Sequence, residues 1–349
     1  MYALIRDILF KFDPEYAHTL SEIFLRHIAN KPLIQDFILK LFFYQNPILK
    51  NEVCGISFSN PIGMAAGFDK NATMIEGLAT LGFGYLELGT ITKYPQAGND
   101  KPRLWRHIAE SSIQNAMGFN NDGSANISQR LSKIYPFKIP LGINLGKNKD
   151  VPIQNALRSY EEVFLDFKHL GDYYVFNLSS PNTPNLRDLQ NISFVDELFS
   201  MAREYTQKPI FLKISPDMQI EDMLKVCEKA IQKKASGIIA TNTSIDYSLV
   251  PFPKDKGGIS GLAIKEKSYQ VFKILAQNFF SQTTLISAGG IDNANEAYKR
   301  IRMGASLLQI FTSFIYKGPS LCKNINQDLA ILLKQDGFEN ISQAIGVDL

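Results

Sequence analysis

Four asparagines form the group of residues in this sequence that most clearly predicts ligand binding. Asn115, Asn177, Asn182 and Asn242 each lie at or beside the end of a short apolar segment. One such asparagine alone is more often a turn or cap residue. Because an amide both donates and accepts hydrogen bonds, four together favour a planar ligand with alternating C=O and N–H groups. Such a set would reject analogues that lack those groups.

A lysine lies inside one of these apolar segments. Lys213 follows an Ile-Phe-Leu run directly, so its ammonium group is predicted to be buried. A buried ammonium group needs an anionic or a carbonyl partner. The N1/O2 edge of a flavin, which gains negative charge on reduction, is one candidate, and a structural ion pair is the other.

Glycines in the last third of the chain form another group. Gly261 and Gly289-Gly290 offer backbone N–H groups without an obstructing side chain, and Phe311-Thr312 follows the last apolar segment. Any one of these glycines alone would be interpreted as a turn residue. Combined with the loop after the last predicted strand, they favour a phosphate site.

These groups are positioned by eight short apolar segments that alternate with helix-length segments from about residue 54 onward. Apolar strands joined by helical crossovers indicate a parallel sheet covered on both faces. Eight such units favour an α/β fold, a closed (β/α)₈ TIM barrel, in which the carboxyl ends of the strands meet at one rim. No Gly-x-Gly-x-x-Gly follows the first segment, which counts against a dinucleotide-binding fold. The predicted strands are residues 62–66, 84–88, 141–144, 174–178, 210–214, 237–241, 284–287 and 307–310, with helices between them that include 193–206, 220–234 and 294–303.

Residues 1–45 are predicted to form a helical extension, with the barrel in residues 46–349. Asp13-Pro14-Glu15 is a typical helix start, with Asp as the cap and Pro at the first helical position. A second apolar stretch, residues 33–44, is rich in Phe. Packing on the barrel is the simpler interpretation of these helices, but their many large apolar residues leave a membrane-facing surface open.

The composition excludes several classes of protein. The chain has 349 residues, of which 45% are apolar and 20% charged, as in a folded protein. A formal charge of +3 gives no electrostatic footprint for nucleic acid. Three scattered cysteines fit neither a disulfide framework nor a zinc site, and no apolar run approaches the roughly 18–20 residues that span a bilayer. We therefore expect an intracellular protein without a metal site, a signal segment or a transmembrane helix.

Beyond these patterns, the sequence resembles the dihydroorotate dehydrogenase family. The similarity runs in order from about residue 53 to 320, and FDPEYAHTL at 12–20 resembles the helical extension of the class 2, quinone-dependent members. The motifs that carry it are AAGFDK (65–70), GNDKPRLWR (98–106), NAMGFNN (115–121), GINLGKNK (142–149), NLSSPNTP (177–184), ATNTS (240–244), GGISG (257–261), SAGGI (287–291) and FTSFIYKGP (311–319).

The resemblance implies an FMN-containing barrel that oxidises dihydroorotate to orotate in pyrimidine (UMP) biosynthesis. Position by position, it implies FMN contacts at Ala66, Gly67, Phe68, Asp69, Lys70, Thr90, Asn144, Asn177, Lys213, Thr241, Gly261, Gly290, Phe311 and Thr312. It implies contacts with dihydroorotate at Lys70, Asn115, Ala116, Met117, Gly118, Phe119, Asn177, Asn182, Asn242 and Thr243.

The resemblance also places the catalytic base at Ser180. Class 1 members have cysteine at this position, and no cysteine of this chain lies near the motif, so Ser180 favours class 2. Ser180 would take a proton from C5 of dihydroorotate while a hydride leaves C6 for N5 of FMN. Because an unassisted serine is a poor base, it needs a proton path. In the family, a water near the positions of Thr183 and Phe119 plays this part.

The partners that the resemblance implies are a membrane quinone as electron acceptor and a membrane surface contacted by the N-terminal helices. We expect a monomer bound peripherally on the cytoplasmic side of the cell membrane. Arg106 matches the polar end of a quinone tunnel, whereas Phe311 departs from the tyrosine common in class 2. The alternatives are a class 1-type soluble enzyme that uses fumarate or NAD, a phosphate-binding barrel lyase or isomerase, and a non-catalytic membrane-binding protein.

Overall fold

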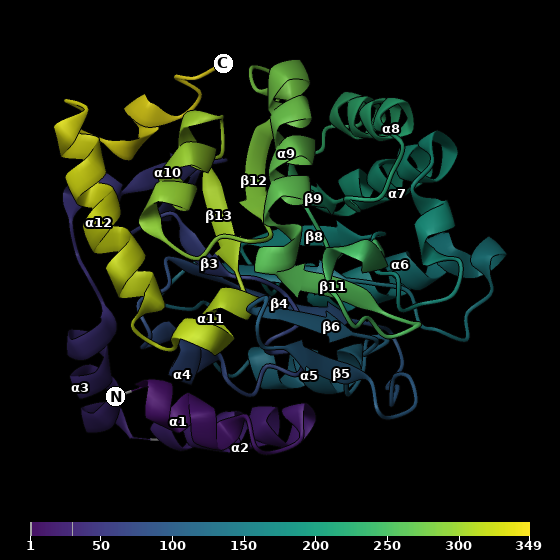
Figure 1. Ribbon diagram of the computed structural model, residues 1–349. Helices are drawn as coiled ribbons and strands as arrows, with labels where there is room; N and C mark the ends of the chain where they lie inside the picture. Colours follow the sequence, from purple (N-terminus) through teal and green to yellow (C-terminus); the bar gives the residue numbers. More distant parts are fainter. Residues whose placement is uncertain (1, 30) are drawn as a thin grey trace.

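The computed structural model describes residues 2–29 and 31–349. Within them, eight parallel strands close into a barrel in the order β10-β12-β13-β3-β4-β7-β8-β9, with helices around its outside (Figure 1). The predicted (β/α)₈ barrel is confirmed, and each predicted strand overlaps one barrel strand. In chain order these strands are β3 (Ile62–Met64), β4 (Tyr85–Ile91), β7 (Leu141–Leu145), β8 (Tyr173–Asn177), β9 (Ile210–Lys213), β10 (Gly237–Ala240), β12 (Thr284–Ala288) and β13 (Leu307–Ile310).

Two of the surrounding helices begin at an asparagine whose side chain caps a free backbone N–H group. The side chains of Asn191 and Asn293 accept hydrogen bonds from the backbone N of Phe194 and Glu296, at the starts of the predicted helices α7 and α10. The helices between or after the barrel strands are α4 (Ile75–Ala79), α5 (Ser124–Leu131), α6 (Ala156–Phe167), α7 (Ile192–Tyr205), α8 (Ile220–Gln232), α9 (Lys265–Phe279), α10 (Ala294–Arg302), α11 (Thr312–Lys317) and α12 (Leu321–Gln335).

The amino-terminal end of the barrel is filled by aromatic side chains. A Cβ atom at Gly63 would lie 2.2 Å from Cζ of Tyr85, so only glycine leaves room for this ring inside the barrel. The hairpin of β1 (Asn51–Val53) and β2 (Ile56–Phe58) brings the Phe58 ring to 5.4 Å from the Tyr85 ring. This end is therefore packed, and the large cavity lies at the opposite end, where the strands finish.

A small antiparallel sheet lies at that opposite end. It consists of β5 (Leu104–His107), β6 (Ser112–Asn115) and β11 (Gly258–Gly261), in the order β11-β6-β5. Asn115 pairs with Gly258 and Ser112 with Gly261. This sheet is not predicted from the sequence, yet two of the predicted site residues, Asn115 and Gly261, lie on it at the barrel rim.

The predicted N-terminal helices are present as α1 (Tyr2–Leu9), α2 (Pro14–Ala29) and α3 (Pro32–Phe42), which lie together on one side of the barrel (Figure 1). Oδ1 of Asp13 accepts hydrogen bonds from the backbone N of Glu15 and Tyr16, as expected for the cap of α2. The boundary predicted at residue 45 falls between α3 and β1, and the division into two domains stays a prediction.

The extension is fixed to the barrel through α11, α4 and the rim sheet. The Tyr2 hydroxyl donates to the carbonyl of Ile315 in α11, with an O–O distance of 2.6 Å. A Cβ atom at Gly77 of α4 would lie 2.5 Å from the Leu25 carbonyl, so glycine allows α2 and α4 to pack closely. Among the described residues, none of the helices combines the length and the apolar character that crossing a membrane requires.

Candidate active site

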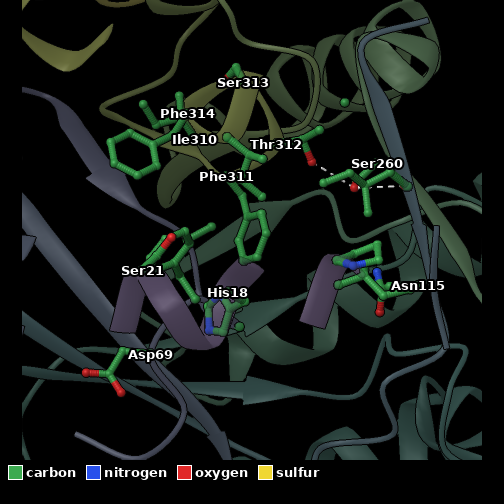
Figure 2. Close-up of a pocket in the computed structure, with 18 of the residues that line it drawn as sticks. His18, Ser21, Asp69, Asn115, Ser260, Ile310, Phe311, Thr312, Ser313 and Phe314 are labelled. Carbon is green, nitrogen blue, oxygen red and sulfur yellow. Dashed lines mark hydrogen bonds between the residues drawn. The ribbon is translucent and has the colours of Figure 1, made fainter. Parts of the chain in front are cut away.

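One cavity of about 1110 Å³ extends from the carboxyl ends of the barrel strands to the N-terminal helices. Figure 2 shows part of it, with His18 of α2 facing Phe311 at the start of α11, and Asn115 and Ser260 on the rim sheet. The cavity brings together nearly all of the predicted site residues. The predicted residues that line it are Ala66, Gly67, Phe68, Asp69, Lys70, Thr90, Asn115, Met117, Gly118, Phe119, Asn177, Ser180, Asn182, Lys213, Thr241, Asn242, Thr243, Gly261, Gly290, Phe311 and Thr312.

Two predicted residues lie behind the cavity wall. Asn144 is fully buried and accepts a hydrogen bond from the Thr90 hydroxyl at 2.5 Å. Ala116 forms two hydrogen bonds with its backbone. Its N donates to the Arg103 carbonyl, and its carbonyl accepts from the side-chain amide of Asn99. Both residues therefore support lining residues within the structure, and a direct ligand contact by either stays a prediction.

The four asparagines meet as two hydrogen-bonded pairs. Nδ2 of Asn182, in the loop after β8, donates to Oδ1 of Asn115 on β6 at 3.0 Å. Nδ2 of Asn242, after β10, donates to Oδ1 of Asn177 at the end of β8 at 3.2 Å. Side chains from distant parts of the sequence therefore lie together at the carboxyl ends of the barrel strands, as predicted from the sequence.

Several buried polar atoms around these asparagines have no hydrogen-bond partner within residues 2–29 and 31–349. They are Oδ1 of Asn182, Oγ1 of Thr183, Oγ1 of Thr243 and Oδ1 of Asn120. Asn120, Asn182 and Thr243 line the cavity, and because a buried polar atom without a partner is costly, their free atoms indicate a polar ligand there. The predicted substrate contacts Asn182 and Thr243 are among them.

Ser180, the predicted base, is buried in the loop after β8. Its Oγ accepts a hydrogen bond from the backbone N of Asn182 at 3.2 Å, which holds the loop in a tight turn. Arg187 fixes the same loop, because its Nε donates to the Ser179 carbonyl at 3.0 Å and its Nη2 donates to the Thr243 carbonyl at 3.0 Å. An ion pair of 3.0 Å between Arg187 and Asp217 orients the guanidinium group. The Ser180 loop and the Thr243 loop are therefore held by one side chain.

Lys70 and His18 face the same part of the cavity from the barrel and from α2. Burial, and then the charge of Arg103, lowers the pKa of Lys70 to about 8. Burial, and then the charge of Lys70, lowers the pKa of His18 to about 4, so this histidine is neutral at pH 7. His18 lies within the FDPEYAHTL motif, but the sequence alone does not identify it as a cavity residue.

Lys213 forms a buried ion pair, which is the second of the two partners predicted for it from the sequence. Its Nζ lies 3.7 Å from Oε1 of Glu87 on β4 and donates to Oε1 of Gln309 on β13 at 3.4 Å. Lys213 also lines the cavity, so the ion pair and a ligand contact are compatible. Glu87 is absent from the predicted residues, although an acid inside the apolar run YLELGTI is a visible signal.

The predicted phosphate loops have backbone conformations that favour glycine. Gly290 has φ 74°, and a Cβ atom there would lie 2.4 Å from Cα of Lys265. Gly261 has φ 100°, and a Cβ atom there would lie 2.6 Å from the Ser111 carbonyl. The hydroxyl groups of Ser260 and Thr312 are hydrogen-bonded at 2.8 Å, which joins the rim sheet to the start of α11 (Figure 2). At both positions a side chain would collide with neighbouring atoms of the protein, so these loops require glycine there.

Asp69 uses its carboxylate within its own loop. Oδ1 accepts hydrogen bonds from the backbone N of Asn71 and Thr73, and Oδ2 accepts from the backbone N of Met74 at 2.7 Å. Burial raises the pKa of Asp69, and these N–H groups oppose that rise. The carboxylate thus shapes the AAGFDK loop, and its predicted contact with a cofactor stays a prediction.

The end of the cavity near the extension is apolar and aromatic. The Phe68 ring lies 5.2 Å from the His18 ring and 5.6 Å from the rings of Phe311 and Phe314. Apolar side chains of α1 and α2 complete this wall, namely Ile5, Leu9, Leu20, Phe24, Leu25 and Ile28. The cavity is therefore polar inside the barrel mouth and apolar beneath the N-terminal helices.

Arg106 of β5 lies where these two parts meet. Its Nη1 donates to the carbonyls of Phe12 at 2.9 Å and Phe10 at 3.3 Å, and its guanidinium group lies 4.5 Å from the centre of the Phe10 ring. Arg106 thus fixes the turn between α1 and α2 to the rim sheet. Its predicted contact with a quinone stays a prediction.

Comparisons with known proteins identify the family of this chain. A family model described as "Dihydroorotate dehydrogenase" matches residues 48–333. "Dihydroorotate dehydrogenase (quinone)" from Helicobacter acinonychis is 54% identical over 349 residues, which cover 100% of this chain and 99% of that protein. The protein of the same name from Mycobacterium tuberculosis is 38% identical over 350 residues, which cover 99% and 98%.

Solved structures give the same result. The structure described as DHODH from Eimeria tenella in complex with ferulenol has a TM-score of 0.86 and 31% sequence identity, and the match covers 98% of both chains. The family model covers most of this chain, and relatives well above 30% identity cover nearly all of it. The protein therefore belongs to the dihydroorotate dehydrogenase family.

Proposed function

We propose that this protein oxidises dihydroorotate to orotate in pyrimidine biosynthesis, with FMN as its prosthetic group and a quinone as electron acceptor. One observation carries the proposal: a single cavity joins a polar mouth with paired asparagines to an apolar chamber beneath the N-terminal helices. The relatives named for the quinone reaction support it, because they match the chain over its full length, including the N-terminal helices.

The flavin would lie in the barrel mouth, and the residues there suit it. Gly261, Gly290 and Thr312 would hold the phosphate with their backbone N–H groups, in loops whose close packing excludes a Cβ atom at both glycines. Lys213 and Lys70 would supply the positive charge that a reduced flavin requires, and Thr90, Asn177 and Thr241 would hydrogen-bond the ring system. When bound, FMN supplies the redox chemistry, since it accepts two electrons from one molecule and passes them to another. Ala66, Gly67, Phe68, Asp69, Asn144 and Phe311 complete the proposed FMN site.

The paired asparagines would bind the pyrimidine ring of dihydroorotate. Oδ1 of Asn182 and Oγ1 of Thr243 are buried and without partners in the described chain, so ring N–H and C=O groups would satisfy them. The ammonium group of Lys70 would bind the substrate carboxylate. The backbone from Asn115 to Phe119 would complete the pocket, with Ala116, Met117 and Gly118 as the remaining predicted contacts.

Ser180 would act as the general base. Its Oγ would take the proton from C5 of dihydroorotate and lose its own proton to a water molecule. Oγ1 of Thr183 is buried and unpaired within the described residues, and the Phe119 ring lies against the wall at Gly146, so this region suits a single held water. The hydrogen bonds of Arg187 to both neighbouring loops would keep Ser180 at reacting distance.

The N-terminal helices would lead a lipophilic quinone from the membrane to the flavin. Neither α1 nor α3 has a buried residue among those described, and Leu33 and Phe37 of α3 are 85% and 68% exposed. Such apolar helices suit the surface of a bilayer, with Lys31 and Lys40 beside the headgroups. The protein would then be peripheral on the cytoplasmic side of the cell membrane.

Anaerobic mixing with dihydroorotate tests the reaction. We expect the purified protein to be yellow and its flavin absorbance to bleach on mixing, and we expect a soluble quinone to restore the absorbance faster than fumarate or NAD. A colourless protein would contradict the proposal in favour of a lyase, an isomerase or a non-catalytic membrane protein. Faster reoxidation by fumarate or NAD would indicate a class 1-type enzyme instead.

A further inference from the structure

One buried carboxylate lies behind the asparagine network and outside the cavity. Glu87 of β4 is 2% exposed and does not line the cavity. Its Oε1 accepts a hydrogen bond from Nδ2 of Asn144 at 2.7 Å, and its Oε2 accepts one from Nε2 of Gln309. An ionised carboxylate only accepts hydrogen bonds, whereas an amide offers a donor on one side and an acceptor on the other. Glu87 therefore determines which way each of these two amides is turned.

The orientation of Asn144 determines that of Asn177. Because Nδ2 of Asn144 points to Glu87, its Oδ1 faces the Thr90 hydroxyl at 2.5 Å and Nδ2 of Asn177 at 3.3 Å. Nδ2 of Asn177 also donates to Oγ1 of Thr90 at 2.9 Å. With its donor side used in this way, Asn177 turns its Oδ1 to the other side, toward the strands that carry the rest of the substrate pocket.

Asn177 in turn determines the orientation of Asn242. Oδ1 of Asn177 accepts from Nδ2 of Asn242 at 3.2 Å and from the Ser179 hydroxyl at 3.0 Å. Oδ1 of Asn242 is left to accept from the backbone N of Thr243 at 2.7 Å. One direction of hydrogen bonding thus runs from the buried acid through three asparagines to the loop after β10.

We propose that Glu87 is a positioning residue that fixes the direction of this hydrogen-bond chain. When an amide reverses, its donor and its acceptor exchange places. A reversed Asn177 or Asn242 would therefore place a donor opposite a ring N–H group or an acceptor opposite a ring C=O group. Glu87 does not line the cavity, and it acts on this chain of amides through Asn144. The inference deepens the proposed function and rests on it for the roles of Asn177 and Asn242 as substrate contacts.

Glu87→Gln tests this directly, because glutamine has the same size but offers both a donor and an acceptor. We expect the variant to fold and to hold flavin, while its dissociation constant for orotate rises roughly ten- to a hundredfold, as one mismatched hydrogen bond would cause. The dissociation constant is read from the change in flavin absorbance on orotate addition, and not from turnover.

Asp172→Asn is the matched control. Oδ2 of Asp172 also accepts a hydrogen bond, from the backbone N of Leu141 at 2.7 Å, but Leu141 is the first residue of β7, at the packed amino-terminal end of the barrel. We expect Asp172→Asn to lower the melting temperature and to leave orotate binding unchanged.

A second pair of variants separates direction from charge, since Glu87 is also the ion-pair partner of Lys213. Lys213→Met keeps the acceptor-only carboxylate, and the double variant E87Q/K213M removes both charges and leaves no unpaired ion. At saturating FMN, we expect the double variant to bind orotate more weakly than K213M by the same factor that separates E87Q from wild type. Equal orotate binding by K213M and E87Q/K213M, or by E87Q and wild type, would overturn the inference. If the inference fails in this way but dihydroorotate still reduces the wild-type flavin, the proposed function is unaffected.

Discussion

The barrel mouth and the N-terminal helices use apolar and polar side chains in opposite ways. In the mouth, polar side chains such as Asn144, Ser180 and Lys213 are buried and joined by hydrogen bonds. In the helices, large apolar side chains are exposed, and α1 and α3 bury no described residue. The first region is preorganised for polar ligands. The second presents apolar surface that a membrane or a lipophilic molecule would cover.

Apolar and polar contacts both join the two regions, and Leu25 and Ile28 of α2 belong to the main core. Arg103 on the barrel side forms an ion pair with Glu15 of α2 at 2.9 Å, and the Thr73 hydroxyl donates to Glu22 at 2.7 Å. Such contacts fix the position of the helices without forming a second large core. The comparison indicates that chemistry on dihydroorotate and access of quinone are separable, which the following variants exploit.

Ser180→Ala has the largest expected effect, and it falls on the barrel mouth alone. Loss of a general base typically lowers a rate by about 10²–10⁴-fold. We expect flavin reduction by dihydroorotate to slow by that amount in stopped-flow measurements, with flavin content unchanged and a small fall in melting temperature from the lost Asn182 hydrogen bond. Ser180→Cys should retain part of the rate, because a thiolate is a better base. Reduction of the alanine variant at the wild-type rate would remove Ser180 from the mechanism.

The double substitution L33E/F37E affects the helices alone. Burial of a large apolar side chain contributes about 1.5–3 kcal/mol, so two charged replacements should weaken binding to anionic liposomes by about tenfold or more. Co-flotation with vesicles measures the bound fraction. Ile220→Glu is the control, because Ile220 is 50% exposed on α8, an element of the barrel. Equal loss of binding in both variants would mean that α3 is not the membrane-contacting surface.

The pH dependence of orotate binding reports on Lys70. Its pKa is lowered to about 8 by burial and by Arg103, so below pH 8 the ammonium group is charged and attracts the orotate carboxylate. Above pH 8 the charge is lost, and we expect affinity to fall by up to about tenfold per pH unit. His18, with a pKa lowered to about 4, stays neutral throughout this range. In Lys70→Met, binding should be weaker and nearly independent of pH between 7 and 9, and the wild-type slope in this variant would refute the assignment.

Phe311→Tyr has the smallest expected effect. The ring lies in the aromatic cluster with Phe68, between the two parts of the cavity. An added hydroxyl would offer one hydrogen bond to a quinone oxygen, worth about 0.5–1.5 kcal/mol. We expect the quinone KM to fall by up to roughly tenfold, while reduction by dihydroorotate stays unchanged. A change confined to flavin reduction would place this side chain in the barrel mouth and not on the quinone route.

The barrel strands could be predicted because each is a short apolar run with a polar residue or glycine at its end. The rim sheet could not, because residues 112–115 pair with 258–261 and no local pattern encodes so distant a pairing. Glu87 was visible as an acid in an apolar strand, but its three partners come from β7, β9 and β13. Asp69 shows the opposite case, since its carboxylate is satisfied by its own loop within five residues.

Deletion of residues 1–43 tests the division between the two regions most directly. The truncated protein is compared with the full chain after its melting temperature and flavin content show that it folds. Dihydroorotate should reduce its flavin at nearly the full-length rate, whereas reoxidation by quinone and binding to liposomes should fall sharply. If quinone reoxidises the truncated protein as fast as the full chain, the N-terminal helices are not the quinone's route to the flavin.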